Sequence, residues 1–136
     1  NPEEFINEIY RVLLPGGMLL LTTPFIWDEH AQPYDYRRYT SFGIRDLLEK
    51  HGFEVIEVRK SLNDFRIIAQ SLNIYIYKKT LTKYTALNYL FTLFFMAPVN
   101  IFGTIFGKIL PQNDDLYMDN IVLARKIRGV MKDEVC

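Results

Sequence analysis

Apolar residues in the first part of the chain recur with the period of a helix. Between Pro2 and Leu14 they return every three or four positions, which is the spacing of one buried helical face. Asn1 suits the N-cap position and Pro2 the first helical position, and the Pro-Gly-Gly run at 15–17 stops the helix. The pattern therefore predicts a helix over residues 2–14.

Strand and helix patterns then alternate. Residues 18–23 form a continuous apolar run, typical of a strand that is buried on both faces. Thr40 or Ser41 caps a helix that reaches Lys50, and the β-branched run at 53–59 predicts another strand. Helix, strand, helix and strand at these lengths are the rhythm of an α/β sheet with crossover helices.

A long uncharged segment follows, because no charged residue occurs between Lys83 and Lys108. Its length alone would allow a membrane span, but asparagine, threonine, glycine and proline residues interrupt it. The pattern predicts two amphipathic helices that break at Pro98, since proline cannot continue the hydrogen-bond ladder of a helix. Residues 62–83 before this segment have a blurred helical period, and residues 116–124 predict a last strand.

Composition and charge narrow the function classes. The 136 residues are enough for one domain with a core, and acidic and basic side chains balance to a formal net charge of zero. The chain therefore lacks the broad positive field that binds phosphate backbones, and we expect no nucleic-acid partner. Its single cysteine, Cys136, excludes an intrachain disulfide and fits a reducing compartment such as the cytoplasm.

Several motifs in order resemble one enzyme family. Residues 8–24, with the Leu-Leu-Pro-Gly-Gly turn and the apolar run after it, closely resemble the helix, turn and fifth strand of class I S-adenosylmethionine-dependent methyltransferases. The resemblance is narrower to the methyltransferase domain 11-like subgroup, which methylates small molecules and lipid or sugar intermediates. The loop at 30–40 and the Glu-Lys-His-Gly-Phe segment at 49–53 are similar to parts of that subgroup. Residues 120–126 resemble the antiparallel seventh strand of the family.

The resemblance covers residues 1–60 well and 116–127 loosely, and it implies an organisation for the chain. Residues 1–60 would be the C-terminal half of the methyltransferase core and 61–115 a helical hydrophobic insertion. Residues 116–127 would be the last antiparallel strand, and 128–136 a charged tail. The implied fold class is α/β, with strands five to seven of a doubly wound seven-stranded sheet and a helical apolar insertion before the last strand.

The resemblance also implies S-adenosyl-L-methionine as the cofactor. The glycine-rich turn that follows the first strand of the family has no counterpart in this sequence, and neither has the acidic residue that holds the ribose of the cofactor. We therefore expect the cofactor-binding residues upstream of Asn1, where the chain opens on a helix cap. We expect the chain to be a fragment that alone neither binds the cofactor well nor turns over.

The candidate site residues lie in the loop after the first predicted strand, since ligand crevices of α/β sheets lie beyond the carboxyl ends of strands. His30 is the candidate general base, because imidazole titrates near neutral pH; the alternative is a loop histidine bonded to a neighbouring carboxylate. Arg37 and Arg38 suit a phosphate or carboxylate, and an ion pair between Asp35 and Arg38 that fixes the loop is equally open. The candidate acceptor-binding residues are Phe25, Trp27, Tyr34, Asp35, Tyr36, Arg37, Arg38 and Tyr39.

Three adjacent residues of this loop invite a metal interpretation. Asp28, Glu29 and His30 are all ligand types, but three neighbours on one loop are a weak signal. The methyltransferases that the chain resembles generally need no metal, and we expect none here.

Residues 84–110 leave several uses open. They would serve as a lid over a lipid-like acceptor, as a homodimer interface, as an in-plane membrane anchor with flanking lysines at the head groups, or as plain core packing. The leading interpretation is a cytoplasmic methyltransferase, peripheral to the membrane, for a small-molecule or lipid-linked acceptor. The alternative is a non-catalytic membrane-peripheral or dimerisation module that retains the back half of the fold.

Overall fold

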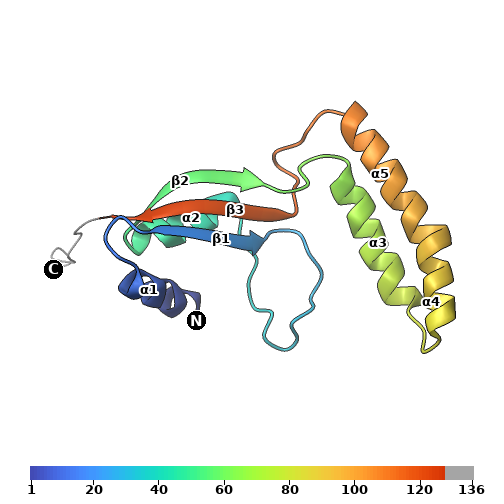
Figure 1. Ribbon diagram of the computed structural model, residues 1–136, viewed down its shortest axis with the longest axis horizontal. Helices are drawn as coiled ribbons and strands as arrows, with labels where there is room; N and C mark the ends of the chain where they lie inside the picture. Colours follow the sequence, from blue (N-terminus) through green and yellow to red (C-terminus); the bar gives the residue numbers. More distant parts are fainter. Residues whose placement is uncertain (128–136) are drawn as a thin grey trace. The chain divides into compact units, whose positions relative to one another are not determined.

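The computed structural model describes residues 1–127, so the expected charged tail at 128–136 lies outside the described residues. Figure 1 shows the helices and strands in chain order. They are α1 (Pro2–Val12), β1 (Met18–Pro24), α2 (Ser41–Lys50), β2 (Phe53–Lys60), α3 (Arg66–Thr80), α4 (Thr85–Phe91), the π-helical turn η1 (Thr92–Met96), α5 (Ala97–Ile109) and β3 (Asp119–Lys126).

The chain forms two compact units. The first contains Asn1–Phe25, Arg37–Arg59 and the chain from Asp119 onward, and the second contains Ile26–Tyr36 and Lys60–Met118. Each unit therefore joins segments that are far apart in the sequence. The loop between β1 and α2 is divided between the two units.

The first unit is built on a three-stranded sheet with the order β1-β3-β2. Strand β3 runs antiparallel to β1, with Met18 opposite Arg125 and Pro24 opposite Asp119. In Figure 1 the arrows of β1 and β2 point the same way, and that of β3 points against both. The predicted α/β class and the antiparallel direction of the last strand are thus confirmed.

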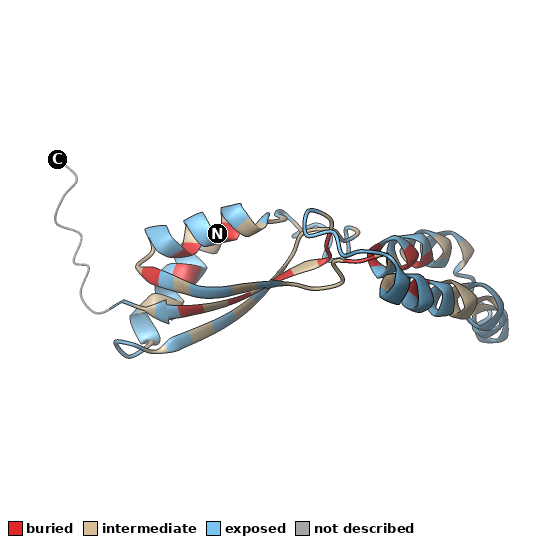
Figure 2. Cartoon of the chain, turned by 90° about the horizontal axis from the view of Figure 1, so that it is seen from above, coloured by how far each residue is buried: buried red, intermediate tan, exposed pale blue. Residues whose placement is uncertain are grey.

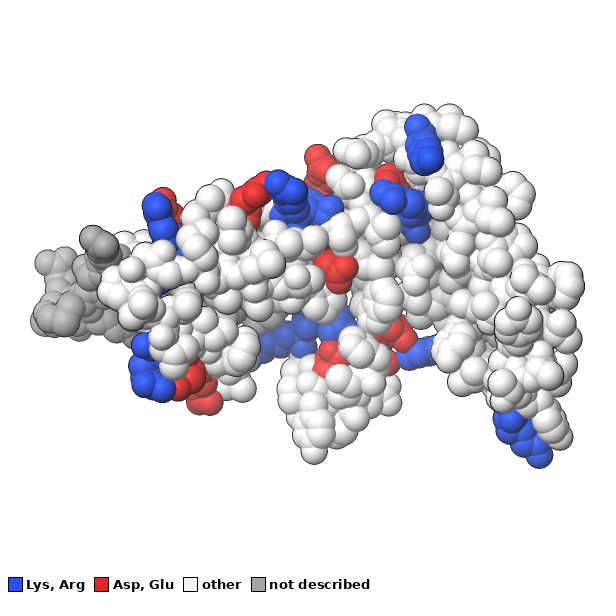
Figure 3. Space-filling view, viewed as in Figure 1, with Lys and Arg blue, Asp and Glu red and all other residues white. Residues whose placement is uncertain are grey.

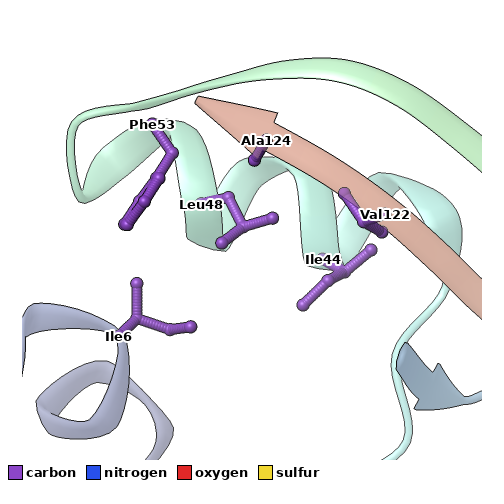
Figure 4. Close-up of a cluster of buried hydrophobic side chains, with 6 residues drawn as sticks. All are labelled: Ile6, Ile44, Leu48, Phe53, Val122 and Ala124. Atoms are coloured by element: carbon purple, nitrogen blue, oxygen red, sulfur yellow. The ribbon is translucent and has the colours of Figure 1, made fainter. Parts of the chain in front are cut away.

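One hydrophobic core lies between this sheet and the helices α1 and α2. In Figure 4 two side chains of α2 face two of β3, and one side chain of α1 points toward the same cluster. Full burial of a large aliphatic or aromatic side chain contributes about 1.5–3 kcal/mol, so a handful of such residues stabilises the unit. The enclosed residues are Ile6, Ile44, Leu48, Phe53, Val122 and Ala124.

The prediction that residues 18–23 are buried on both faces is wrong. Along β1 exposed and half-buried residues alternate, and Leu19 and Leu21 pack on the core. Leu20 points away from it and is 68% exposed. The reason is that both helices of the unit contribute to a core on the same face of the sheet, as period-two alternation requires.

Local signals produce the helix ends that the sequence predicts. The side chain of Asn1 caps α1 by accepting a backbone N–H of the first turn, and Thr40 Oγ1 caps α2 by accepting the N–H of Gly43 at 3.0 Å. Gly52 follows α2 with a φ of +83°, and a Cβ there would lie 2.7 Å from the ring of Tyr10. Glycine is therefore required at this position by both conformation and space.

The second unit contains the helices, and the predicted break at Pro98 is wrong. Thr85–Ile109 is one continuous helix of 25 residues. In a regular α-helix the ring of Pro98 would collide with the carbonyl of Phe94. The π-helical turn Thr92–Met96 lies just before the proline and widens the helix there. The helix thus accommodates Pro98 by widening at the π turn instead of ending there.

Replacement of Leu48 by alanine should lower the free energy of unfolding of the 136-residue chain by about 2–5 kcal/mol, because a fully buried side chain leaves a cavity. The matched control, Leu20→Ala, removes the same atoms from the exposed face and should cost less than about 0.5 kcal/mol. Urea unfolding followed by circular dichroism measures both. Equal losses in the two variants would contradict a core on one face of the sheet.

Candidate functional site

The chain leaves the carboxyl end of β1 in a loop whose predicted site residues divide between the two units. Phe25, Arg37, Arg38 and Tyr39 belong to the first unit, and Ile26–Tyr36 belongs to the second. The second unit therefore contains the candidate base His30 and the candidate acceptor-binding residues Trp27, Tyr34, Asp35 and Tyr36.

Lys78 of α3 holds the loop of the second unit. Its Nζ lies 2.5 Å from Asp28 Oδ2 and donates to the carbonyl oxygen of Glu29 at 2.9 Å. The hydrogen bond from the ammonium group lowers the pKa of Asp28 below the ordinary value of an aspartate. At neutral pH the loop is thus bound to the helix by an ion pair and a hydrogen bond.

A cavity of about 380 Å³ lies beside this ion pair. Trp27 and Tyr75 contribute aromatic walls, and Lys79 adds a second cation. The volume falls within the range of about 300–1,000 Å³ that is common for ligand sites. An apolar cavity next to cations suits an apolar group that carries an anionic or polar head. The complete lining is Ile26, Trp27, Asp28, Ser71, Ile74, Tyr75, Lys78 and Lys79.

His30 lies in the same loop and is oriented by its neighbours. Asp35 Oδ2 accepts the backbone N–H of His30 at 3.2 Å and lies 3.7 Å from the ring atom Nδ1. Nδ1 is also 3.1 Å from the carbonyl oxygen of Asp28. A carbonyl oxygen only accepts, so this contact favours the tautomer with the proton on Nδ1 and a lone pair on Nε2. The histidine side chain is 56% exposed.

The remaining aromatic and basic residues of the loop lie outside the cavity. Tyr34 and Tyr36 are exposed, and their rings meet edge to face with centroids 6.3 Å apart. Arg38 Nη1 donates to the carbonyl oxygen of Arg37 at 3.1 Å. Trp27 is thus the one predicted acceptor-binding residue that lines the cavity.

The first unit contains a second polar feature, at the carboxyl end of β1. Thr23 lies opposite Asn120 in the strand register, and Asn120 Nδ2 donates to the carbonyl oxygen of Tyr39 at 2.7 Å. Thr23 Oγ1, Tyr39 Oη and Asn120 Oδ1 are buried without a partner among the described residues. A buried unpaired oxygen costs about 1–3 kcal/mol, so this position favours an ordered water or the polar group of a ligand.

Titratable side chains do not gather into a metal site in the described part of the chain. Asp28 is engaged by Lys78, and Asp35 faces His30. Within residues 1–127 no group of three or more histidine, cysteine, aspartate or glutamate side chains is placed to hold a metal ion.

Several residues of these sites, Lys78, Tyr75 and Asn120 among them, were not predicted from the sequence. Lys78 and Tyr75 belong to a helix with a blurred period, and no pattern links them to a loop far upstream. The sequence pattern could have indicated Asn120, because this residue precedes Val122 and Ala124 on the buried face of β3. An amide among alternating buried apolar residues of a strand is a candidate for a specific hydrogen bond.

Comparison with solved structures gives the fold a relative. The chain is similar to phosphoethanolamine N-methyltransferase 2 from Haemonchus contortus in complex with phosphomonomethylethanolamine and S-adenosylhomocysteine. The TM-score is 0.53 and the sequence identity 20%, and the match covers 94% of this chain and 30% of that chain. No protein-family model matches the sequence, and no curated protein matches it significantly. The likeness shows that the chain shares the fold of a part of that protein, of which it spans about a third of the length.

Replacement of Lys78 by methionine should raise the pKa of Asp28 toward its ordinary value of about 3.9, because the ammonium group no longer stabilises the carboxylate. With the lysine present, the contribution of the ion pair to stability is complete above that ordinary value. It is lost only as the pH falls through the depressed pKa of the folded chain. A carboxyl NMR titration of Asp28 measures the midpoint.

Lys79→Met is the matched control, since Lys79 lines the same cavity but is not among the groups that lower the pKa of Asp28. It should leave the midpoint unchanged. An identical Asp28 midpoint in Lys78→Met and in the unchanged chain would show that the ion pair does not hold the loop.

Proposed function

We propose that this chain is part of an S-adenosylmethionine-dependent methyltransferase and supplies residues on the acceptor side of its active site. The observation that supports this most is the fold likeness, which extends over 94% of the chain. The resemblance of residues 8–24 to the fifth-strand unit of that family supports it independently. The chain spans 30% of the length of the matched methyltransferase, so the complete reaction needs residues beyond those described.

Residues 1–127 do not by themselves fit the cofactor. Nucleotide-binding α/β folds place a glycine-rich turn after a strand, where the backbone approaches the phosphate or ribose. The positive-φ glycines, Gly16 and Gly52, both precede strands instead. We therefore assign S-adenosyl-L-methionine binding to residues outside this range and derive no step through the cofactor here.

The cavity beside Lys78 is the proposed acceptor subsite. Trp27 and Tyr75 would contact an apolar part of the acceptor, and the cations of Lys78 and Lys79 would favour an anionic or polar group. A small amphiphile or a lipid-linked acceptor has this combination of groups.

His30 is the proposed base of the acceptor side. When the acceptor is a hydroxyl or a protonated amine, its proton must leave before or during methyl transfer. The tautomer favoured by the Asp28 carbonyl leaves Nε2 to accept that proton. The Asp35 carboxylate, 3.7 Å from Nδ1, would then stabilise the imidazolium that forms.

A second candidate function rests on a different observation. The helix Thr85–Ile109 is apolar and only 6% of its most apolar stretch is buried. A non-catalytic module that attaches to membranes or dimerises through this helix would explain that exposure without any reaction. Methyl-transfer activity distinguishes the two, because the module would have none in any form of the protein.

Calorimetric titration of S-adenosylmethionine should show no binding to the 136-residue chain. It should show binding to a form extended upstream by about 100 residues, the size of the missing half of a nucleotide-binding fold. The same two samples can be titrated with S-adenosylhomocysteine as a product control. Absence of binding by both forms would overturn the methyltransferase proposal.

In the form that turns over, His30→Gln should lower kcat by about 100-fold or more, because the proton acceptor is lost. Cofactor affinity should not change, since His30 is assigned to the acceptor side. The matched control is His51→Gln, the other histidine of the chain, which lies at the end of α2 with Nδ1 2.7 Å from the carbonyl oxygen of Leu47. A kcat equally insensitive to both substitutions would remove His30 from the chemistry.

A further inference from the structure

The helices of the second unit have an inverted distribution of side chains. The residues buried there are Ile67, Ala69 and Asn73 of α3 and Gly103 of α5. None of the leucines and phenylalanines between 85 and 109 is buried, and Figure 2 draws most of these helices in the exposed colour. A helix pair in water buries its large apolar side chains instead. Apart from Ile67, the residues inside are small or carry an amide, and an inside of that kind beneath large apolar side chains is typical of helices in lipid.

The contact between α3 and α5 is the kind that small residues allow. A Cβ added at Gly103 would lie 2.5 Å from the Cβ of Ala69, and Gly107 is the next small residue one turn later. Asn73 Nδ2 donates to Asn100 Oδ1 at 2.7 Å across the same contact. Glycines four residues apart and an interhelical amide bond hold helices together where the surroundings are as apolar as the side chains.

Several polar side chains on these helices make hydrogen bonds within the protein. Four hydroxyl groups donate to the carbonyl oxygen four residues earlier, at 2.8 or 2.9 Å, and they belong to Ser71, Thr80, Thr92 and Thr104. Asn88 Nδ2 donates to the carbonyl oxygen of Thr82 at 2.8 Å, and Asn88 Oδ1 accepts the N–H of Thr82. Such back-bonded groups enter an apolar medium at little cost.

The outward face of the long helix is strongly apolar. Its most apolar stretch has a mean hydropathy of 1.7. On this helix Phe94 is 65% exposed and Phe102 60%. In Figure 3 the surface over α4 and α5 is uncharged between basic groups near its ends. The exposed large apolar side chains of this helix include Phe94, Ile101, Phe102, Ile105 and Ile109.

The charges at the ends of the helices favour a position in the plane of a membrane. Lys83 and Lys108 flank the helix, and nothing charged lies between them. The apolar part of α3, residues 67–77, extends about 16 Å at 1.5 Å per residue, about half of a hydrocarbon core. Lys78 is bound to Asp28 and Glu29 of the polar loop, which keeps that end of α3 in water. α3 is therefore too short to cross the bilayer beside the long helix.

We infer that the helix Thr85–Ile109 lies in the plane of a membrane surface. Its outward face enters the acyl boundary, and Lys79, Lys83 and Lys108 contact anionic head groups. The occupant of the apolar face is thus lipid, and α3 lies on the water side of α5. This inference is independent of the proposed function, because it needs neither cofactor nor acceptor.

Flotation of the 136-residue chain with vesicles tests it. Vesicles of phosphatidylcholine with about a third phosphatidylglycerol should carry the chain upward, and phosphatidylcholine alone should carry less of it. Phe94→Gln, Phe102→Gln and Ile105→Gln together should lower the bound fraction at least about 10-fold, because three large apolar side chains no longer enter the lipid. Circular dichroism verifies folding, and Phe102→Gln alone serves where the triple variant does not fold.

The matched control replaces two phenylalanines and one isoleucine that are exposed in the first unit. Phe5→Gln, Phe42→Gln and Ile56→Gln together should leave flotation unchanged.

The depth of the helix in the membrane is measured by tryptophan fluorescence. The variant carries Phe102→Trp and Trp27→Phe, and brominated lipids quench the new tryptophan. Shallow bromines should quench more than deep ones, and trypsin added outside should still cut after Lys83.

Three results would overturn the inference. The first is no flotation of the unchanged chain, or an equal loss in the control triple variant. The second is a dimer by light scattering that the Phe94, Phe102 and Ile105 substitutions dissolve, without flotation, which assigns the face to a second copy. The third is deep quenching with Lys83 protected, which means a span.

Discussion

The ammonium group of Lys78 makes two contacts with one loop, and the position of that loop determines what the second unit can bind. An exposed ion pair contributes little to stability by itself. Here its effect is geometric, because it ties the loop that carries Trp27 to the helix that carries Tyr75, and both residues line the cavity. The same contact fixes one end of α3 on the polar side of the unit. The proposed acceptor subsite and the inferred orientation at a membrane therefore both depend on this lysine.

Those parts of the fold that follow from neighbouring residues could be predicted from the sequence. Asn1 and Thr40 are caps whose partners lie within one turn, and Gly52 satisfies a backbone requirement at its own position. The faces of β1 could not be predicted, since a continuous apolar run does not say which side a helix covers. Pro98 was misjudged for a related reason. Proline excludes a regular α-helical turn before it, but a π turn satisfies the same restriction.

The candidate site shows the same difference between features that neighbouring residues determine and features that depend on residues far apart in the sequence. Residues adjacent in the loop looked like one site, yet Trp27 lines the cavity while Tyr34 and Tyr36 face outward. The cavity is completed by Tyr75 and Lys78, whose spatial partners no single-sequence rule identifies. Recognition of the methyltransferase-like segment at 8–24 agreed with the solved relative at the level of the fold. Which atoms act on an acceptor is a question of side-chain position that such a resemblance does not reach.

The π turn at Thr92–Met96 has a consequence for how the long helix presents its surface. A π turn holds about one residue more than an α turn, and each residue of an α-helix advances the direction of its side chain by about 100°. The side-chain directions of α4 and α5 are therefore offset from each other by roughly that angle about the helix axis. The apolar positions therefore spread over a broad part of the helix surface. The positions before and after the π turn do not follow a single α-helical spacing. The π turn thus widens a narrow apolar stripe into a surface broad enough for the membrane contact inferred above.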